Sequence, residues 1–351
     1  MDYIETGRTI YTHLADDISK EIFCHRTLYS MTGDVRHIQN LVGSSIDDSK
    51  SITNAFECIG KTYIFGAGTW GKEIAHVWGA YITAFLDNNP TKNDGSISLE
   101  GIPILSPKCL LEDEGPKTVI IGTRLYYADI CRQLEEQGIE NMNIVNIGAV
   151  LDKLAEKQYF DLNALTKESK EIFADIGSFD GMSSLRFFKW SDSSQSKAIC
   201  FEPDPDNVLK CEENLKDYIS NCAVEIIRKG AWSKNTTLRF ASRGNGSSTT
   251  SEEFMKNDET IEIEVTKLDD IFRNRDVTFI KMDIEGAEYE ALKGCEETIR
   301  KKKPKLAICV YHKPEDIFVL PKLILDFCAD YKLYLRHYSI AAAETVLYAI
   351  P

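Results

Sequence analysis

The chain has 351 residues, a formal net charge of −14, 43% hydrophobic residues and 27% charged residues. This length exceeds one ordinary domain, the composition is typical of a soluble globular protein, and the acidic balance excludes the broad basic surface that a nucleic-acid-binding protein needs. No apolar run approaches the roughly 18 residues that span a bilayer, and the polar N-terminus resembles no secretory signal, so we expect a cytoplasmic protein that does not bind membranes.

Residues 1–55 are predicted to form a helical N-terminal extension, because Leu14, Ile18 and Ile22 recur at helical spacing between charged residues. Residues 56–150 alternate short β-rich runs with helical stretches. This alternation predicts a smaller, Rossmann-like α/β domain with a parallel sheet. Its expected strands are Thr62–Phe65, Tyr81–Leu86, Thr118–Ile121 and Ile144–Ile147.

A glycine-rich turn follows the first of these strands, with glycines at Gly66, Gly68 and Gly71, and Asp87 ends the next strand. This spacing is that of a dinucleotide-binding loop whose acid contacts the ribose, although the domain is about half the size of a full dinucleotide fold. The segments 85–90 and 101–105 resemble the N-terminal domain of sugar O-acyltransferases that modify nucleotide-linked sugars. That resemblance implies a nucleotide-sugar site at these glycines and Asp87. NAD binding and a scaffold or dimerisation role are the alternatives.

Residues 151–351 contain short apolar strands separated mostly by helices, which predicts a doubly wound α/β sheet. The last two strands are joined by a short loop, which predicts an antiparallel hairpin at one end. We expect these strands at Ile172–Ile176, Ala198–Glu202, Val224–Ile227, Ile261–Val265, Phe279–Asp283, Leu306–Val310, Tyr331–His337 and Thr345–Ile350.

The run from Asp175 to Gly181 ends the first of these strands and opens a helix. Gly177 and Gly181 let the backbone approach a ligand closely, and open α/β sheets bind ligands at this end of their strands. Phe179 occupies the place of the second glycine of a dinucleotide loop, and acids flank it. The turn therefore suits a cationic ligand without phosphates, such as S-adenosylmethionine (SAM), better than a pyrophosphate.

Two further acidic sites follow later strands. Glu202 lies about 20 residues after Gly181, where a doubly wound fold places the carboxylate that accepts hydrogen bonds from ribose hydroxyls. Asp283, Glu285 and Glu288 are grouped at another strand end. Because grouped carboxylates repel one another, we expect them to bind a substrate hydroxyl or ammonium, act as a base or ligate a divalent ion. Favourable acids at a helix N-terminus are the alternative.

Together, the runs 175–181, 201–204, 282–288, 335–339 and 344–351 resemble the FkbM family of SAM-dependent methyltransferases. The resemblance covers about the last 180 residues. It implies a seven-stranded methyltransferase fold and methylation of a hydroxyl. By position, Asp175, Gly177 and Gly181 then line the methionine and ribose of SAM, and Asp283 borders the transferred methyl group. Glu202 holds the ribose, and three residues lie near the adenine: Gly230, Ala231 and Trp232.

A hydroxyl is a poor nucleophile, so methyl transfer benefits from a general base. His312 follows a strand that ends at the same rim as Asp283, and we expect these two residues to be catalytic. His337 is a weaker candidate for the base. Asp283 and His312 as ligands of a divalent ion are an alternative, but their spacing matches no established metal motif, so we expect no metal.

The sequence thus predicts a two-domain enzyme that transfers a methyl group from SAM to a hydroxyl, with a sugar of polysaccharide biosynthesis as the expected small-molecule partner. The oligomeric state is left open. One alternative is a polyketide or other small metabolite as acceptor. A second is a non-catalytic nucleotide-sugar-binding protein, and a third is an NAD-dependent oxidoreductase that uses the first glycine loop.

Overall fold

The computed structural model describes residues 2–46, 49–57, 60–89, 91–123, 126–139, 141–241 and 260–351. The chain forms two compact units. The larger unit contains Met1–Phe23, Tyr159–Arg336 and Thr345–Pro351, and the smaller unit contains Cys24–Gln158 and His337–Glu344. Within the described ranges, no helix is both long and apolar enough to cross a membrane.

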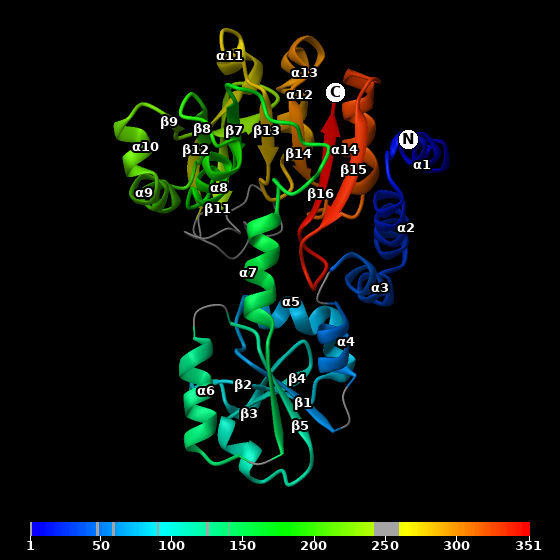
Figure 1. The fold of residues 1–351 in the computed structure, drawn as a ribbon, viewed down its shortest axis with the longest axis vertical. Coiled ribbons are helices and arrows are strands. Elements are labelled where there is room, and N and C mark those ends of the chain that lie inside the picture. The colour runs from blue at the N-terminus through cyan, green and yellow to red at the C-terminus, as the bar shows by residue number, and fades with distance from the viewer. Residues whose placement is uncertain are drawn as a thin grey trace. The chain divides into compact units, whose positions relative to one another are not determined.

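The larger unit is built on a seven-stranded sheet with the order β15-β16-β14-β13-β7-β8-β9 (Figure 1). β9, β8, β7, β13 and β14 are parallel, and β16 pairs with β14 in the antiparallel direction. Five of the seven strands consist almost wholly of buried residues, as expected where helices cover a sheet on both faces. The strands are β7 (Ile172–Ile176), β8 (Lys197–Phe201), β9 (Val224–Ile227), β13 (Phe279–Met282), β14 (Lys305–Cys309), β15 (Lys332–His337) and β16 (Thr345–Ile350).

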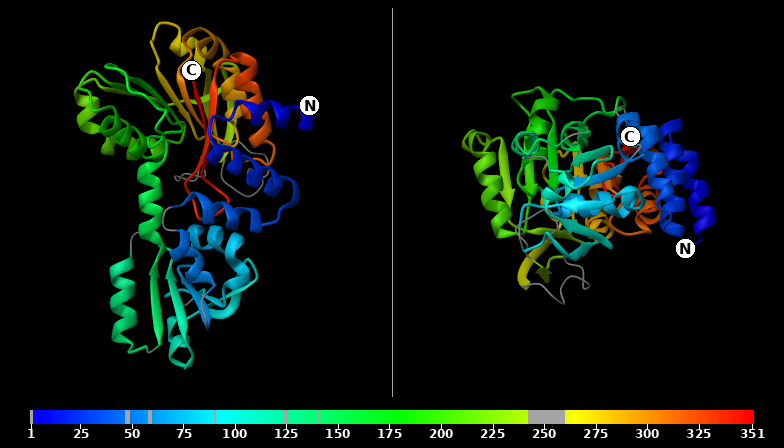
Figure 2. Two further views of the ribbon diagram at one scale, coloured as in Figure 1. Left: turned by 45° about the vertical axis from the view of Figure 1, so that its right-hand side comes forward. Right: turned by 90° about the horizontal axis from the view of Figure 1, so that it is seen from below.

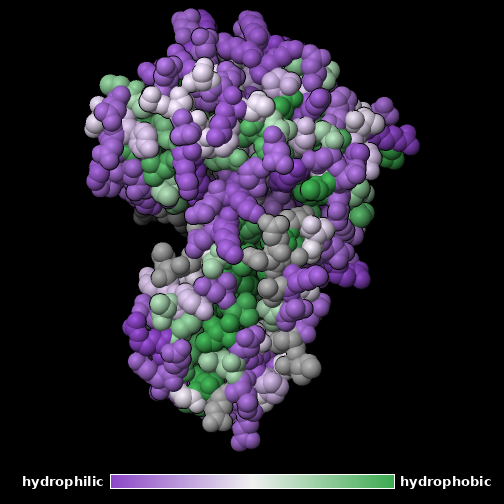
Figure 3. All heavy atoms as spheres, in the orientation of Figure 1, coloured by the Kyte–Doolittle hydropathy of each residue, from purple (hydrophilic) through white to green (hydrophobic). Residues whose placement is uncertain are grey.

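Helices connect these strands, and α1 packs against α14 at one end of the sheet (Figure 2). The first helices of the chain therefore belong partly to this unit: α1 lies within it, and α2 begins in it. The helices are α1 (Tyr3–His13), α2 (Asp17–Thr32), α8 (Met182–Ser191), α9 (Pro205–Asn214), α10 (Lys216–Ser220), α11 (Leu268–Phe272), α12 (Glu288–Lys293), α13 (Glu296–Lys302) and α14 (Asp316–Phe327). Hydrophilic residues cover most of this unit on the face seen in Figure 3.

A second, three-stranded sheet adjoins the first and has the order β10-β12-β11. Its strands are β10 (Gly230–Trp232), β11 (Thr236–Ala241) and β12 (Thr260–Lys267). Phe240, Ile263 and Val265 form a small apolar cluster of their own, with Trp232 packed against it. This sheet supplies the apolar side of the cavity described below.

The smaller unit contains a six-stranded sheet with the order β3-β4-β2-β1-β5-β6, in which β3 pairs antiparallel with β4 and the other pairs are parallel. Its strands are β1 (Lys61–Phe65), β2 (Ala84–Leu86), β3 (Asp94–Leu99), β4 (Ile102–Leu105), β5 (Lys117–Ile121) and β6 (Met142–Asn146). Its helices are α3 (Arg36–Ser45), α4 (Ser49–Phe56), α5 (Thr69–Trp78), η1 (Gly79–Tyr81), η2 (Pro107–Leu111), α6 (Tyr127–Glu136) and α7 (Ile147–Lys157).

The prediction of an α/β protein is confirmed, with mixed sheets in both halves. One detail predicted from the sequence is wrong. The expected strand at 261–265 is β12, which pairs in the three-stranded sheet and not in the main one.

The units also differ from the division at residues 55 and 150. Residues up to Phe23 group with the C-terminal half, because Ala15 and Ser19 hydrogen-bond to the backbone of β15. The loop His337–Glu344 groups with the smaller unit. There Arg26 donates to the carbonyl of Ala342, and the indole Nε1 of Trp78 donates to the carbonyl of Ile340 at 2.8 Å.

The Trp78–Ile340 hydrogen bond is buried, so its loss leaves a buried carbonyl without its donor. We expect Trp78→Phe to lower the free energy of unfolding by about 1–3 kcal/mol. Tyr81→Phe is the matched control, because Tyr81 lies beside Trp78 but is exposed, and it should change stability by less than about 0.5 kcal/mol. Urea denaturation measures both. Equal stability of the two variants would show that the loop is not held by Trp78.

Candidate functional site

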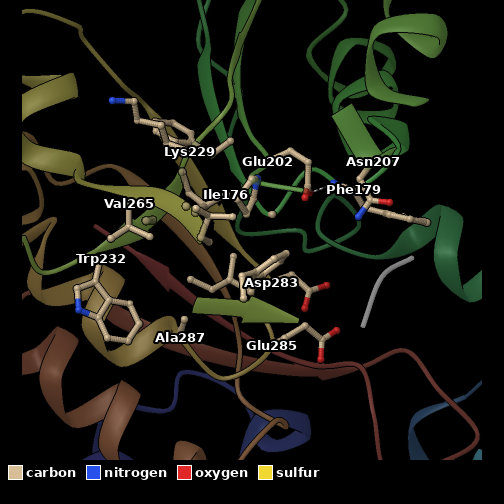
Figure 4. A pocket seen from close by; sticks show the side chains of 18 residues that line it. Ile176, Phe179, Glu202, Asn207, Lys229, Trp232, Val265, Asp283, Glu285 and Ala287 are labelled. Carbon is tan, nitrogen blue, oxygen red and sulfur yellow. Dashed lines mark hydrogen bonds between the residues drawn. The ribbon is translucent and has the colours of Figure 1, made fainter. Parts of the chain in front are cut away.

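A cavity of about 620 Å³ opens at the carboxyl ends of β7, β8 and β13 and extends to the three-stranded sheet. Parallel strands end at one edge of a sheet, so residues far apart in sequence meet there. Figure 4 shows the side chains that surround it. The lining residues are Ile176, Gly177, Phe179, Phe201, Glu202, Pro203, Asn207, Lys229, Gly230, Ala231, Trp232, Phe240, Ile263, Val265, Asp283, Ile284, Glu285 and Ala287.

Glu202 supplies a carboxylate on one side of the cavity, beside Asn207 (Figure 4). It follows β8 and is 5% exposed. Its Oε2 accepts the backbone N–H of Phe179 at 2.9 Å, and its Oε1 accepts that of Asp204 at 3.0 Å. Burial raises the pKa of Glu202 to about 7, although these two N–H groups oppose the shift. The side-chain amide of Asn207 also hydrogen-bonds to this carboxylate. A carboxylate has about four acceptor positions, so Glu202 can still accept a ligand hydroxyl.

The opposite region of the cavity is apolar. Trp232 and Val265 lie together there (Figure 4), with Ala231, Phe240 and Ile263 also in the wall. A flat, weakly polar group such as a purine suits such a wall, whereas a phosphate does not. The site therefore fits a ligand with vicinal hydroxyls at one end of an aromatic base, which is the chemistry of an adenosine.

Asp283 supplies a second carboxylate, and Figure 4 shows it beside that of Glu285. Its Oδ2 accepts the hydroxyl of Tyr159 at 2.9 Å, and its Oδ1 accepts that of Tyr311 at 3.3 Å. Burial raises the pKa of Asp283, but the positive charges of Lys281 and His312 and the Tyr159 hydrogen bond outweigh it, and the net pKa is lowered. Asp283 is therefore an anion at neutral pH, poised to accept a hydrogen bond.

His312 lies behind Asp283, with its side chain 7% exposed. Its Nε2 is 3.4 Å from Oδ1 of Asp283, and its Nδ1 is 3.0 Å from Oε1 of Glu288. Burial opposes the charged ring, but Glu288, Asp283 and Glu285 raise the pKa of His312 to about 10. Such a ring holds its proton at neutral pH, so it stabilises the negative charge of Asp283 and is a poor base in this state.

Asp175 lies beneath the cavity and not in its wall. It is fully buried, with Oδ1 3.1 Å from Nζ of Lys281 and Oδ2 accepting the hydroxyls of Ser183 at 2.5 Å and Ser184 at 2.7 Å. Lys281 also donates to the carbonyl of Gly177 at 2.6 Å. Burial opposes the charge of Lys281, but Asp175 and Asp283 raise its pKa overall. This buried ion pair joins β7 to β13 and holds the turn that carries Gly177.

Gly177 and Gly181 in this turn each have a positive φ and no room for a Cβ, but the neighbour that excludes the Cβ differs. Gly177 has φ +78°, and a Cβ there would lie 2.0 Å from the carbonyl oxygen of Asp283. Gly181 has φ +81° and begins α8, and a Cβ there would lie 2.8 Å from the side chain of Leu215. At both positions, the atoms that a Cβ would approach belong to the protein itself.

The structure thus brings together six of the predicted residues in one cavity wall: Gly177, Glu202, Gly230, Ala231, Trp232 and Asp283. Asp175, Gly181 and His312 support this wall from outside the lining residues. His337, the weaker candidate for the base, is not among the residues that line this cavity. It is 3% exposed and belongs to the smaller unit, where burial and the charge of Arg26 lower its pKa to about 3.

Sequence reasoning missed Tyr159 and Lys281 as parts of the site. Tyr159 lies in the connector before β7, 124 residues from the carboxylate that it contacts, and no motif surrounds it. Lys281 is visible in the sequence as a lysine inside an otherwise apolar strand. A charged residue in a buried strand requires a partner, and that signal could have singled out Lys281, but the identity of its partner depends on the pairing of β13 with β7.

In the smaller unit, the glycine turn follows β1 and begins α5 as predicted. Gly66 has φ +113°, and a Cβ at Gly66 or Gly68 would meet no atom within 4 Å. A Cβ at Gly71 would lie 2.2 Å from the carbonyl oxygen of Gly66. Asp87 follows β2 and accepts the backbone N–H of Asn89 at 2.8 Å. The turn thus leaves open space above its first two glycines.

The C-terminal half of the chain is similar to known methyltransferases. Residues 175–337 match the family described as the methyltransferase FkbM domain. The chain is 25% identical over 164 residues to the 2-O-methyltransferase NoeI of Sinorhizobium fredii (strain NBRC 101917 / NGR234), which is 41% of this chain and 65% of that protein. It therefore spans slightly less than two thirds of the length of this curated relative.

Among solved structures, the methyltransferase FkbM of Methylobacillus flagellatus KT superposes with a TM-score of 0.52 at 20% identity, over 92% of this chain and 100% of that one. This similarity establishes a common fold. The fibrillarin of Aeropyrum pernix, solved with natively bound S-adenosyl-L-methionine, has a TM-score of 0.36 at 12% identity, over 59% of this chain and 81% of that one. The match to the methyltransferase FkbM domain itself lies in the C-terminal half of the chain, over residues 175–337.

The buried Asp175–Lys281 pair predicts a large effect of removing one partner. Lys281→Met leaves the Asp175 carboxylate buried without its counter-ion, and we expect the free energy of unfolding to fall by about 3–5 kcal/mol. Lys293→Met is the control, because Lys293 forms a partly exposed ion pair with Glu290, and it should cost less than about 1 kcal/mol. Guanidinium denaturation measures both. A cost below 1 kcal/mol for Lys281→Met would contradict a structural role of the pair.

Glu202 predicts a specific pH dependence of stability. Its folded pKa of about 7 lies above its ordinary value of 4.5. Between these pH values the folded protein keeps a proton that the unfolded chain releases, so the free energy of unfolding falls as pH rises from about 4.5 to about 7. Glu202→Gln should remove this component, which urea denaturation at pH 5 and pH 7.5 measures. Identical pH dependence in the variant and the wild type would show that Glu202 is not the titrating group.

Proposed function

We propose that the chain is a SAM-dependent O-methyltransferase, with residues 151–351 as its catalytic domain. The observation that carries the proposal is Glu202, a carboxylate that is 5% exposed and faces a cavity with an apolar wall on the other side. Burial of a carboxylate costs free energy unless the carboxylate is hydrogen-bonded, and the hydroxyls of a ligand at this strand end would supply such hydrogen bonds. The matching FkbM domain supports SAM as that ligand.

SAM, when bound, supplies an already activated methyl group, so the protein mainly has to align the acceptor with it. Glu202 would accept a ribose hydroxyl, and the wall formed by Ala231, Trp232 and Val265 would enclose the adenine. Asp283 would hold the acceptor hydroxyl and take up the proton that this hydroxyl loses when it is methylated. His312 and Tyr159 keep Asp283 ionised and oriented.

We further propose that the acceptor is a sugar, in the biosynthesis of a surface polysaccharide, and that the reaction takes place in the cytoplasm. The name of the relative from Sinorhizobium fredii, a 2-O-methyltransferase, supports transfer to oxygen. The glycine turn of the smaller unit, Gly66, Gly68 and Gly71 with Asp87, supports a second site that binds a nucleotide or a nucleotide-linked sugar. Its open space above Gly66 and Gly68 leaves room for a phosphate to approach the backbone.

The first test is calorimetry of the full chain with SAM, S-adenosylhomocysteine, NADH and a nucleotide-linked sugar such as a UDP-hexose. We expect micromolar binding of the two sulfur ligands and no binding of NADH. Binding of NADH alone would favour an oxidoreductase. Binding of the UDP-hexose alone would favour a nucleotide-sugar-binding protein without methyltransferase activity.

Glu202→Ala should weaken SAM binding by about 1.5–3 kcal/mol, the scale of charge-assisted hydrogen bonds. Glu213→Ala is the control, because Glu213 is exposed on α9 in the same unit, and its dissociation constant for SAM should match that of the wild type. An unchanged dissociation constant for Glu202→Ala would remove Glu202 from the ribose site.

Asp283→Asn should lower turnover by about 10²- to 10⁴-fold, because the amide cannot take a proton, while SAM affinity changes little. Turnover is measured as formation of S-adenosylhomocysteine with a panel of monosaccharides and nucleotide-linked sugars. Equal losses of turnover and SAM affinity would mean that Asp283 serves only to bind the cofactor.

A further inference from the structure

We infer that Asp283, Glu288 and His312 form a binding site for a divalent cation of the Mn²⁺ class, which holds the acceptor hydroxyl at the rim of the cavity. Each of the three residues offers one ligand atom, and these atoms all lie within 4.8 Å of one another. The inference deepens the proposed function and rests on it only for the role of the cation, not for its binding.

The three ligands come from turns that the fold brings to one place. Asp283 follows β13, Glu288 begins α12, and His312 follows β14, the neighbour of β13 in the sheet. The backbone N–H of Ile284 donates to Oε1 of Glu288 at 2.8 Å and orients this carboxylate. The ligand atoms are therefore fixed by turn geometry and not by long flexible side chains.

The charges of this cluster favour a cation. Three carboxylates, those of Asp283, Glu285 and Glu288, lie within 3.7 Å of the ring nitrogens of His312. With the neighbouring ion pair of Asp175 and Lys281 included, four carboxylates face two positive charges, those of Lys281 and the imidazole, which leaves an excess of two. A divalent ion would offset this excess at the place where it arises.

Buried polar atoms without hydrogen bonds are the second, independent observation. Glu288 is 1% exposed and the side chain of His312 is 7% exposed. In the part of the chain that the structure describes, Oε2 of Glu288 makes no hydrogen bond, and the ring nitrogens of His312 have only the ion-pair contacts given above, without hydrogen-bond geometry. Buried polar groups without partners are costly and rare, and they are explained when a ligand completes them.

The donor set determines the class of ion. Two carboxylates and one imidazole suit Mn²⁺ or a similar divalent ion, which accepts both oxygen and nitrogen ligands. The ion would bind the ring of His312 in its neutral form, so its binding releases the proton that the ring otherwise holds. Three protein ligands leave positions open for water or substrate, as catalytic metal sites do. Because Asp283 and Glu285 line the cavity, an acceptor hydroxyl that enters it can occupy one of these positions. A hydroxyl on such an ion loses its proton more readily than a free one.

The test is titration of the chelator-treated full chain with Mn²⁺, followed by the electron paramagnetic resonance signal of the free ion. We expect one saturable site per chain in the wild type. Glu288→Gln and His312→Gln should each weaken Mn²⁺ binding by at least ~10-fold. Glu315→Gln is the matched control, because Glu315 is exposed in the same loop as His312, and its binding curve should equal that of the wild type.

Calorimetry with SAM on the same samples separates this inference from the proposed function. SAM binding that persists in Glu288→Gln and His312→Gln shows that both variants are folded. Absence of saturable Mn²⁺ binding to a wild type that binds SAM would overturn the metal site and leave the proposed function standing. Mn²⁺ binding that is unchanged in both variants would overturn it as well. A further outcome is a wild type that binds Mn²⁺ but not SAM, together with two variants that do not bind Mn²⁺. This outcome would support the metal site and contradict the proposed function.

Discussion

The buried ion pair between Asp175 and Lys281 is the interaction on which the rest of the site depends. It joins the ends of β7 and β13, and the same lysine donates to the carbonyl of Gly177. Gly177 in turn packs against the backbone of Asp283, so close that no side chain fits between them. One lysine thus sets the distance between the turn proposed to bind SAM and the carboxylate proposed to bind the acceptor.

Glu202 and Asp283 are both buried carboxylates, but their surroundings shift their pKa values in opposite directions. Burial dominates at Glu202 and raises its pKa, and the carboxylate of Asp204 adds to the rise, while backbone N–H groups and the amide of Asn207 oppose it. Asp283 is surrounded by Lys281, His312 and Tyr159, so its pKa falls in spite of burial. Glu202 would be stabilised by new hydrogen-bond donors, and the hydroxyls of a ribose are such donors. Asp283 is already ionised, so it can accept the proton of a hydroxyl or bind a cation. The two proposed roles therefore follow from different surroundings of the same functional group.

Much of this could be predicted from the sequence, because the strands of the main sheet are short apolar runs that end in acids or glycines. Three site residues are each the first residue after a strand: Gly177, Glu202 and Asp283. The run 230–232 begins shortly after β9. All of them meet at the cavity because parallel strands end at one edge of the sheet. What could not be predicted depends on tertiary packing. Tyr159 reaches Asp283 from a connector without a motif, and Asp175 points into the core because Lys281 lies on the adjacent strand. The charge state of His312 depends on three acids that only the folded turns bring around it.

The most direct test of the account is a crystal structure of the full chain with S-adenosylhomocysteine. The account predicts the product in the cavity between the two sheets, with a ribose hydroxyl on Glu202, the adenine against Trp232 and Val265, and the sulfur facing Asp283. Product bound elsewhere, or bound in this cavity with its ribose away from Glu202, would contradict the assignment of the two carboxylates from which the mechanism follows.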